Sequence, residues 1–124
     1  YQDLMGEKLT ISDVTKLLED FYRDSTEAPT PDLIIEETAK YYNLASDDLK
    51  GQNRARNIVN ARQIAMYIIR KLTNLSLVDI GDSFNGRDHS TVLSSIRKVE
   101  ESISASREAS QTIKDIISNI NSRN

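Results

Sequence analysis

The chain has 124 residues, 38% of them hydrophobic, which is enough for one modest domain, or for one domain with part of another. It contains no cysteine, which excludes disulfides and thiolate metal sites and is compatible with a reducing compartment. No apolar run approaches the length of a membrane span, and no signal peptide is recognisable. Because the first residue is Tyr rather than Met, we expect a piece of a longer protein.

The net charge of −3 is distributed unevenly along the chain. Residues 1–50 carry five basic and twelve acidic side chains, a net charge of −7. Residues 51–98 carry eight against three, a net charge of +5, and residues 99–124 carry three against four, a net charge of −1. Nucleic-acid binding depends on a local basic patch rather than on the whole-chain sum. The middle segment therefore contains the candidate surface for nucleic acid.

Hydrophobic periodicity predicts helices throughout the chain and no strand. The first helix begins at the capping box Thr10–Asp13. Its apolar stripe comprises Ile11, Val14, Leu17, Leu18 and Phe21. The segment Ser25–Pro31, with two prolines and small polar residues, predicts a linker. We therefore divide the chain into a fragment at 1–25 and a helical domain at 26–124.

The second predicted helix follows the N-cap Thr30, has Pro31 at its first position and ends near Asn43. A single helical turn is predicted at Ser46–Leu49, and a longer helix at Ile58–Thr73. The expected inner face of the second helix comprises Ile35, Ala39 and Tyr42, and that of the longer helix Ile58, Ala61, Ile64, Ala65, Ile68 and Leu72.

Two amphipathic segments, Ser76–Ser83 and Asp88–Ile103, flank a short turn with glycine and predict a helix-turn-helix. Gly81 and Gly86 would permit close packing and a tight corner. A Ser-rich stretch, Ser102–Ser110, is expected to precede a last helix. The inner positions of the last two helices are Val92, Leu93, Ile96, Val99 and Ile103, then Ile113, Ile116, Ile117 and Ile120. The predicted fold is an all-α helical bundle containing a helix-turn-helix.

Four polar residues, Asp88, His89, Ser90 and Thr91, occupy the first turn of the second helix of this motif. Such residues face base edges when a recognition helix enters the major groove. Asp88 is either the N-cap of the helix or an acceptor for a cytosine amino group. His89 fits a surface role as well as contact with a phosphate or base. Ser90 and Thr91 alone would be unremarkable, but the four together favour base readout.

Arg87 lies in the corner, where it could reach a phosphate or brace the turn, for example through a carboxylate such as that of Asp82. We favour bracing, because arginines in turns often satisfy loop carbonyls. The basic loop 51–57 holds Arg54 and Arg56. It is either a solvated loop or an arm that inserts an arginine into a narrow minor groove.

Helix geometry places Gln63 and Arg70 within roughly 20° of one another, with Arg62 on the adjoining face. These three residues predict a ridge opposite the buried stripe that grips the phosphate backbone, although solvent exposure alone would also explain them. No acidic residue occurs between Gln52 and Val78, which favours the phosphate interpretation.

The segments Ile80–Thr91 (IGDSFNGRDHST) and Arg62–Tyr67 (RQIAMY) resemble the signature of the DnaA family of bacterial replication initiators. The resemblance extends over roughly Thr30 to Ile120. A weaker match at Glu7–Asp24 is similar to the last helix of the lid of the family's AAA+ ATPase module. The resemblance implies a Trp-repressor-like DNA-binding domain at 26–124 and a lid fragment at 1–25.

The resemblance also implies a function, the binding of double-stranded DNA at replication-origin boxes. It implies base contacts by Arg54 in the minor groove and by Asp88, His89 and Ser90 in the major groove. It implies backbone contacts by Arg56, Arg62, Gln63, Arg70, Leu77, Val78 and Thr91.

No catalytic residue, metal or cofactor is expected in this chain, which lacks the Gly-rich phosphate loop. The resemblance assigns ATP or ADP, Mg and self-assembly to an upstream module of the full-length protein. It implies a bacterial cytoplasmic, nucleoid-associated protein, and we expect the chain itself to be monomeric.

Some positions depart from the family pattern. Proline is common where Ala61 and Val78 stand, and its absence at Ala61 is expected to loosen the entry to the long helix. Lysine is frequent at the position of Gln52, so one cationic contact is lost. Threonine is frequent at the position of Ser90, and losing its methyl predicts weaker discrimination of a thymine.

Two other functions stay open on the residues alone. One is a helix-turn-helix transcriptional regulator, which would need a dimerisation surface such as the stripe Ile113–Ile120. The other is a protein-interaction adaptor whose acidic N-terminal half binds a partner. Failure to bind any duplex at low salt would favour the adaptor.

Overall fold

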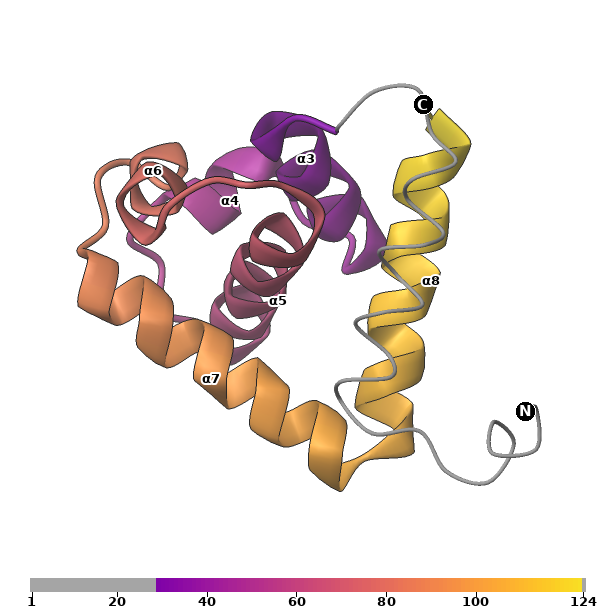
Figure 1. Ribbon diagram of the computed structural model, residues 1–124. Helices are drawn as coiled ribbons and strands as arrows, with labels where there is room; N and C mark the ends of the chain where they lie inside the picture. Colours follow the sequence, from indigo (N-terminus) through magenta and orange to yellow (C-terminus); the bar gives the residue numbers. More distant parts are fainter. Residues whose placement is uncertain (1–28, 124) are drawn as a thin grey trace.

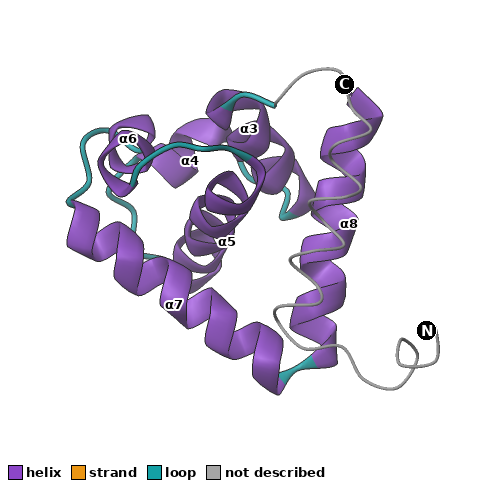
Figure 2. Ribbon diagram, viewed as in Figure 1, coloured by secondary structure: helices purple, strands orange, loops and turns teal. Residues whose placement is uncertain are grey.

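The computed structural model describes residues 29–123, and every regular element in this part of the chain is a helix (Figures 1 and 2). The helices are α3 (Pro31–Tyr41), α4 (Ser46–Lys50), α5 (Arg56–Leu72), α6 (Leu77–Ser83), α7 (His89–Ala105) and α8 (Arg107–Arg123). The predicted all-α helical bundle is confirmed. The predicted helix that begins at Thr10–Asp13 and the fragment 1–25 lie outside the described residues.

Helix α5 runs through the middle of the bundle, and the other five described helices pack around it (Figure 1). Its buried residues include Met66, Tyr67 and Ile69 in addition to the predicted stripe. A helix surrounded by neighbours buries more than one face, whereas the predicted pattern was the single stripe of a surface helix. The core is therefore larger than the periodicity indicated.

Local capping explains where several helices begin and end. Thr30 Oγ1 accepts a hydrogen bond from the Leu33 N–H at 3.1 Å, and Ser76 Oγ accepts one from the Asp79 N–H at 3.1 Å. Each bond satisfies one of the N–H groups that a helix start leaves without a partner. Asn43 has a φ of 60° and follows the end of α3, as predicted.

Helix α5 begins at Arg56, earlier than the predicted start at Ile58. Ala61 lies inside α5 and is fully buried. Because alanine keeps the N–H that a proline lacks, the helix runs unbroken through this position. Whether the missing proline loosens the helix entry stays a prediction, which the stability of an Ala61→Pro variant would measure.

The Ser-rich stretch does not precede the last helix, as was expected: it is helical on both sides of Ser106, and α8 begins inside it at Arg107. Ser102 Oγ donates to the Lys98 carbonyl at 3.1 Å within α7. Ser106 Oγ accepts from the Ala109 N–H at 3.2 Å at the start of α8. Ser102 thus bonds within α7 without interrupting it, whereas Ser106 is extended, separates the two helices and caps the start of α8.

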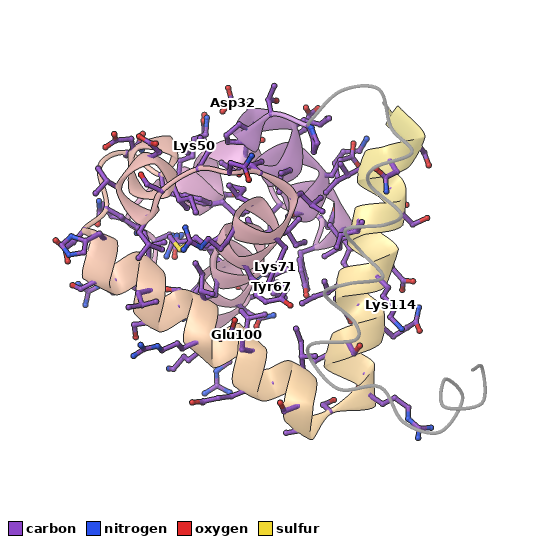
Figure 3. All side chains as sticks on the ribbon, in the orientation of Figure 1. Asp32, Lys50, Tyr67, Lys71, Glu100 and Lys114 are labelled. Carbon is purple, nitrogen blue, oxygen red and sulfur yellow. The ribbon has the colours of Figure 1, made fainter. Side chains whose placement is uncertain are left out.

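Charged side chains link neighbouring helices at the surface (Figure 3). Lys71 Nζ of α5 lies 5.5 Å from the Tyr67 ring centroid and 3.9 Å from the Glu100 carboxylate of α7. Lys50 Nζ of α4 lies 3.3 Å from the Asp32 carboxylate of α3. Such pairs contribute about 0–1 kcal/mol each, so the apolar core supplies most of the stability.

Candidate nucleic-acid interface

Helices α6 and α7 form the predicted helix-turn-helix. The N–H groups of Phe84, Gly86 and Arg87 all donate to the Gly81 carbonyl at 3.0 Å. Asn85 and Gly86 have φ angles of 64° and 80°, which reverse the chain within the turn. Left-handed backbone suits glycine and is tolerated by asparagine. The predicted tight corner is confirmed.

The first turn of α7 is polar and exposed. Asp88 is its N-cap: Oδ2 accepts the Ser90 N–H at 3.0 Å and also accepts the Ser90 hydroxyl. These bonds, led by the one from the hydroxyl, lower the pKa of the Asp88 carboxyl below its ordinary value. His89 Nδ1 lies 3.8 Å from Asp88 Oδ1, and Thr91 is exposed beside them. The predicted N-cap is confirmed, and this turn is accessible to a ligand.

The loop 51–55 starts beside this corner and holds Arg54 in solvent. Asn85 Nδ2 donates to the Lys50 carbonyl at 2.8 Å. Arg87 donates to the carbonyls of Lys50 and Gly51 at 3.2 and 2.7 Å. Arg54 is three residues after Gly51, and each residue advances the chain by at most about 3.6 Å. Arg54 therefore lies within about 11 Å of the Gly51 backbone that Arg87 binds. The structure thus brings the arginine loop to the corner that carries the polar turn.

Arg87 braces the corner, as the sequence favoured. Its partners are the carbonyls of Lys50, Gly51 and, at 3.2 Å, Phe84, rather than the carboxylate of Asp82. Burial lowers the pKa of the Arg87 guanidinium. The residue joins the helix-turn-helix to the preceding loop instead of stabilising only its own turn.

Arg62 does not lie on an exposed ridge, and that prediction was wrong. The residue is only 6% exposed, and its Nε donates to the Leu49 carbonyl at 2.7 Å. Its other acceptors are the carbonyls of Asp48, Gly51 and Asn53, at 3.3, 3.2 and 2.9 Å. Burial lowers the pKa of Arg62, and the positive charge of Arg87 lowers it further. This side of α5 is covered by the end of α4 and by the segment that follows it, whose carbonyls accept hydrogen bonds from the guanidinium.

The other residues of the predicted ridge lie in different surroundings. Gln63 is half-buried and lines an open groove of about 730 Å³ together with Lys98, between α5, α7 and α8. Arg70 is exposed, and its Nη1 donates to the Leu75 carbonyl at 3.1 Å, just before α6. Arg70 therefore lies next to the start of α6, whereas Gln63 faces the groove beside α7.

The start of α6 presents an aliphatic surface. Val78 is 57% exposed, and Leu77 beside it is half-buried against the core. Arg56, the first residue of α5, is also exposed. These three residues can reach a partner from the places where the sequence put them.

Two exposed cations of α7, Arg97 and Lys98, were not singled out from the sequence. Arg97 lies seven residues after Ser90, so two turns of helix bring it to nearly the same face. Counting the helical period onward from the polar first turn was the signal that could have identified it.

Within residues 29–123, no group of three or more metal-ligating side chains gathers at one place. None of the described helices combines the length and apolar character that a bilayer-spanning segment needs. The exposed polar turn of α7 and the arginine loop thus remain the main candidate features.

Comparisons with known proteins point to one family. The family model described as bacterial dnaA protein helix-turn-helix matches residues 31–99. Similar proteins include the chromosomal replication initiator protein DnaA of Cutibacterium acnes, which is 40% identical over 121 residues, or 97% of this chain. The protein of the same name from Corynebacterium jeikeium is 40% identical over 123 residues, or 98% of this chain. The chain spans only 24% and 21% of the length of these two relatives.

Proposed function

This chain belongs to the bacterial DnaA family, and from that premise we propose that it binds double-stranded DNA sequence-specifically at replication-origin boxes. In the complex, the N-terminal end of α7 lies in the major groove and the loop with Arg54 enters the adjacent minor groove. The domain directs the protein to its binding sites on the chromosome and performs no catalysis itself.

The first turn of α7 provides the contacts with bases. The carboxylate of Asp88 can accept a hydrogen bond from the amino group of cytosine, and His89 and Ser90 offer donors and acceptors. Thr91 holds a phosphate at the groove edge. The proposal is supported by their exposure in front of the fully buried Val92, which fixes the direction in which this turn faces.

The loop at 51–55 provides the contact with the minor groove. A narrow minor groove has an enhanced negative potential that attracts an inserted arginine. Arg54 is exposed, and the start of its loop is hydrogen-bonded to the helix-turn-helix corner. This attachment supports simultaneous contact with both grooves.

The remaining contacts are with the DNA backbone. Arg56, Gln63 and Arg70 bind phosphates, while Leu77 and Val78 pack against the sugar–phosphate chain. Since Arg62 is buried, only the arginines at 54, 56 and 70 count as predicted cationic contacts. With three such contacts, log K should fall with log salt at a slope of about −2.7.

For the whole protein we extend the proposal to the parts outside the helix-turn-helix domain. Residues 1–25 form the end of an AAA+ lid, and the AAA+ module binds ATP or ADP with Mg and mediates self-assembly at the origin. The protein acts in the bacterial cytoplasm, associated with the nucleoid. The isolated chain is a monomer, which sedimentation of the 124-residue protein tests.

The observation that carries the proposal is the exposed polar first turn of α7, hydrogen-bonded through its corner to an arginine loop. The test begins with a duplex pool randomised over about 10 base pairs, one helical turn, from which the chain selects its preferred box.

Titration then compares the selected duplex with a scrambled one at two salt concentrations. We expect the selected duplex to bind at least about 10³-fold more tightly at physiological salt. Arg107→Ala, at the exposed start of α8 beyond the far end of α7, serves as the control and should retain this ratio. Equal affinity for the two duplexes would contradict specific recognition.

A further inference from the structure

Two arginines from different elements meet at one carbonyl oxygen. Arg62 of α5 and Arg87 of the helix-turn-helix corner both donate to the Gly51 carbonyl, at 3.2 and 2.7 Å. Together, the two guanidiniums also hold the carbonyls of Asp48, Leu49, Lys50 and Asn53. Nearly every carbonyl of the segment 48–53 therefore points at one of two positive charges.

The backbone itself explains why these carbonyls need partners. The carbonyls of residues 48–50 are the last of α4. The last carbonyls of a helix accept no hydrogen bond from an N–H group of the same helix. The same end of a helix carries partial negative charge, which attracts cations. Because α4 has only five residues, it has little stability of its own. The conformation of 48–53 thus depends on the two guanidiniums.

Among residues 29–123, no opposite charge is paired with either guanidinium. Within the described part of the chain, the salt bridges involve other residues, and no carboxylate pairs with Arg62 or Arg87. Burial lowers the pKa of both groups, and their mutual repulsion lowers that of Arg62 further. A pair held together against repulsion is a poor device for stability alone, since apolar side chains pack as well without desolvating charge.

We infer that Arg62 and Arg87 are positioning residues that hold Arg54 at a fixed spacing from Asp88, His89 and Ser90. The inference rests on the proposed function. Arg62 is part of α5 and binds the loop to that helix. Arg87 immediately precedes the N-cap Asp88 of α7, and it binds the same loop to the start of that helix. A loop ordered before binding loses less conformational entropy in the complex, so contacts with the two grooves reinforce one another.

A double-mutant cycle on the 124-residue chain tests the inference with the selected duplex. If Arg87 acts through Arg54, Arg87→Ala should lower affinity about tenfold in the unaltered chain but less than about twofold in the Arg54→Ala background. In that background the slope of log K against log salt should also stay unchanged, because Arg87 makes no phosphate contact of its own.

The base-preference profile separates positioning from folding. Arg87→Ala should flatten the preference at the same base pairs as Arg54→Ala, whereas a role in folding alone lowers the melting temperature and leaves the preference intact. Arg62→Lys should act in the same direction, since a lysine cannot hold four carbonyls at once. Should Arg87→Ala fail to fold, Arg87→Lys takes its place in the cycle, and we expect it to lower the affinity for the selected duplex about threefold in the unaltered chain.

Equal losses in the two backgrounds would overturn the inference, and so would an unchanged base preference in Arg87→Ala. Arg107→Ala is again the matched control, an exposed arginine remote from the loop. If the unaltered chain does not distinguish selected from scrambled duplex, the proposed function fails, and the inference fails with it.

Discussion

A Cβ atom added to Gly81 would lie 2.1 Å from the carbonyl oxygen of Arg87. That oxygen belongs to the backbone, so it cannot rotate away as the end of a flexible side chain could. Only glycine lets α6 approach the start of α7 this closely. The contact therefore sets the position of the helix whose first turn faces the DNA in our proposal.

Gly81→Ala should destabilise the domain by about 3 kcal/mol, because one of the two helices must shift to admit the methyl group. Gly86→Ala is the matched control: nothing lies within 4 Å of the added Cβ, and only the φ of 80° opposes it. That strain costs about 1–2 kcal/mol. Urea denaturation measures both free energies of unfolding, and equal losses would contradict the assignment.

The Asp88 carboxyl should titrate below the ordinary value of about 3.9 for aspartate. Because the folded-state pKa is lowered, this carboxylate contributes its full stability above the ordinary value. The contribution is lost as the pH falls through the folded-state pKa. Asp88 should therefore add no pH dependence to stability between about pH 5 and 8, and carboxyl NMR shifts measure its midpoint directly.

Ser90→Ala identifies the cause of this shift. The hydrogen bond from the Ser90 hydroxyl is the largest influence, so its removal should raise the Asp88 pKa toward the ordinary value. Ser94→Ala, one turn further along the exposed side of α7, should leave the midpoint where it was. A midpoint insensitive to Ser90→Ala would assign the lowered pKa to another group.

Local signals made the helix-turn-helix predictable. The caps Thr30, Ser76 and Asp88 accept hydrogen bonds from N–H groups no more than three residues further along the chain. All the backbone hydrogen bonds that close the glycine corner lie within the seven residues 81–87. Because the partners of such interactions are only a few residues apart, local sequence patterns are enough to predict them. The exposed polar turn of α7 followed directly from them.

Arg62 shows where prediction from the sequence stopped. Its acceptors lie 9 to 14 residues away and are backbone carbonyls, which every residue possesses and no pattern marks. The charge of Arg62 and its position on a helix face suggested solvent. Only the tertiary packing of α4 and the segment after it against α5 buries that face. The buried flanks of α5 were missed for the same reason.

Arg54→Ala and Arg56→Ala should have different effects although they remove the same charge from neighbouring sites. Arg54→Ala should weaken binding to the selected duplex by about 1–3 kcal/mol and relax the preference at the base pairs it contacts. Arg56→Ala should weaken binding to all duplexes alike, and each of the two substitutions should reduce the salt slope by about 1 because each removes one cationic contact. Titrations of both variants against single-base-pair substitutions measure the difference, and identical profiles would refute the separate roles.

Val78→Asp should weaken DNA binding without unfolding the domain. The side chain is 57% exposed, so its replacement should change stability by no more than about 0.5 kcal/mol. A carboxylate beside the phosphates should oppose binding of selected and scrambled duplex alike, by about 1 kcal/mol in dilute salt. Asn119→Asp on the exposed side of α8 is the control with the same change in charge. Equal affinities of the two variants would remove α6 from the interface.

Ser90→Thr should sharpen recognition of one thymine. The hydroxyl of residue 90 already bonds to Asp88, so a threonine can keep that bond and add a methyl on an exposed side chain. Burying about one methyl against the thymine C5 methyl is worth about 0.8 kcal/mol, or about fourfold in affinity. Replacing each thymine of the selected duplex by deoxyuridine, one at a time, locates this gain, and Ser94→Thr should show none. If no position shows a larger thymine preference in Ser90→Thr than in the unaltered chain, residue 90 does not contact a thymine methyl, and its hydroxyl serves the N-cap alone.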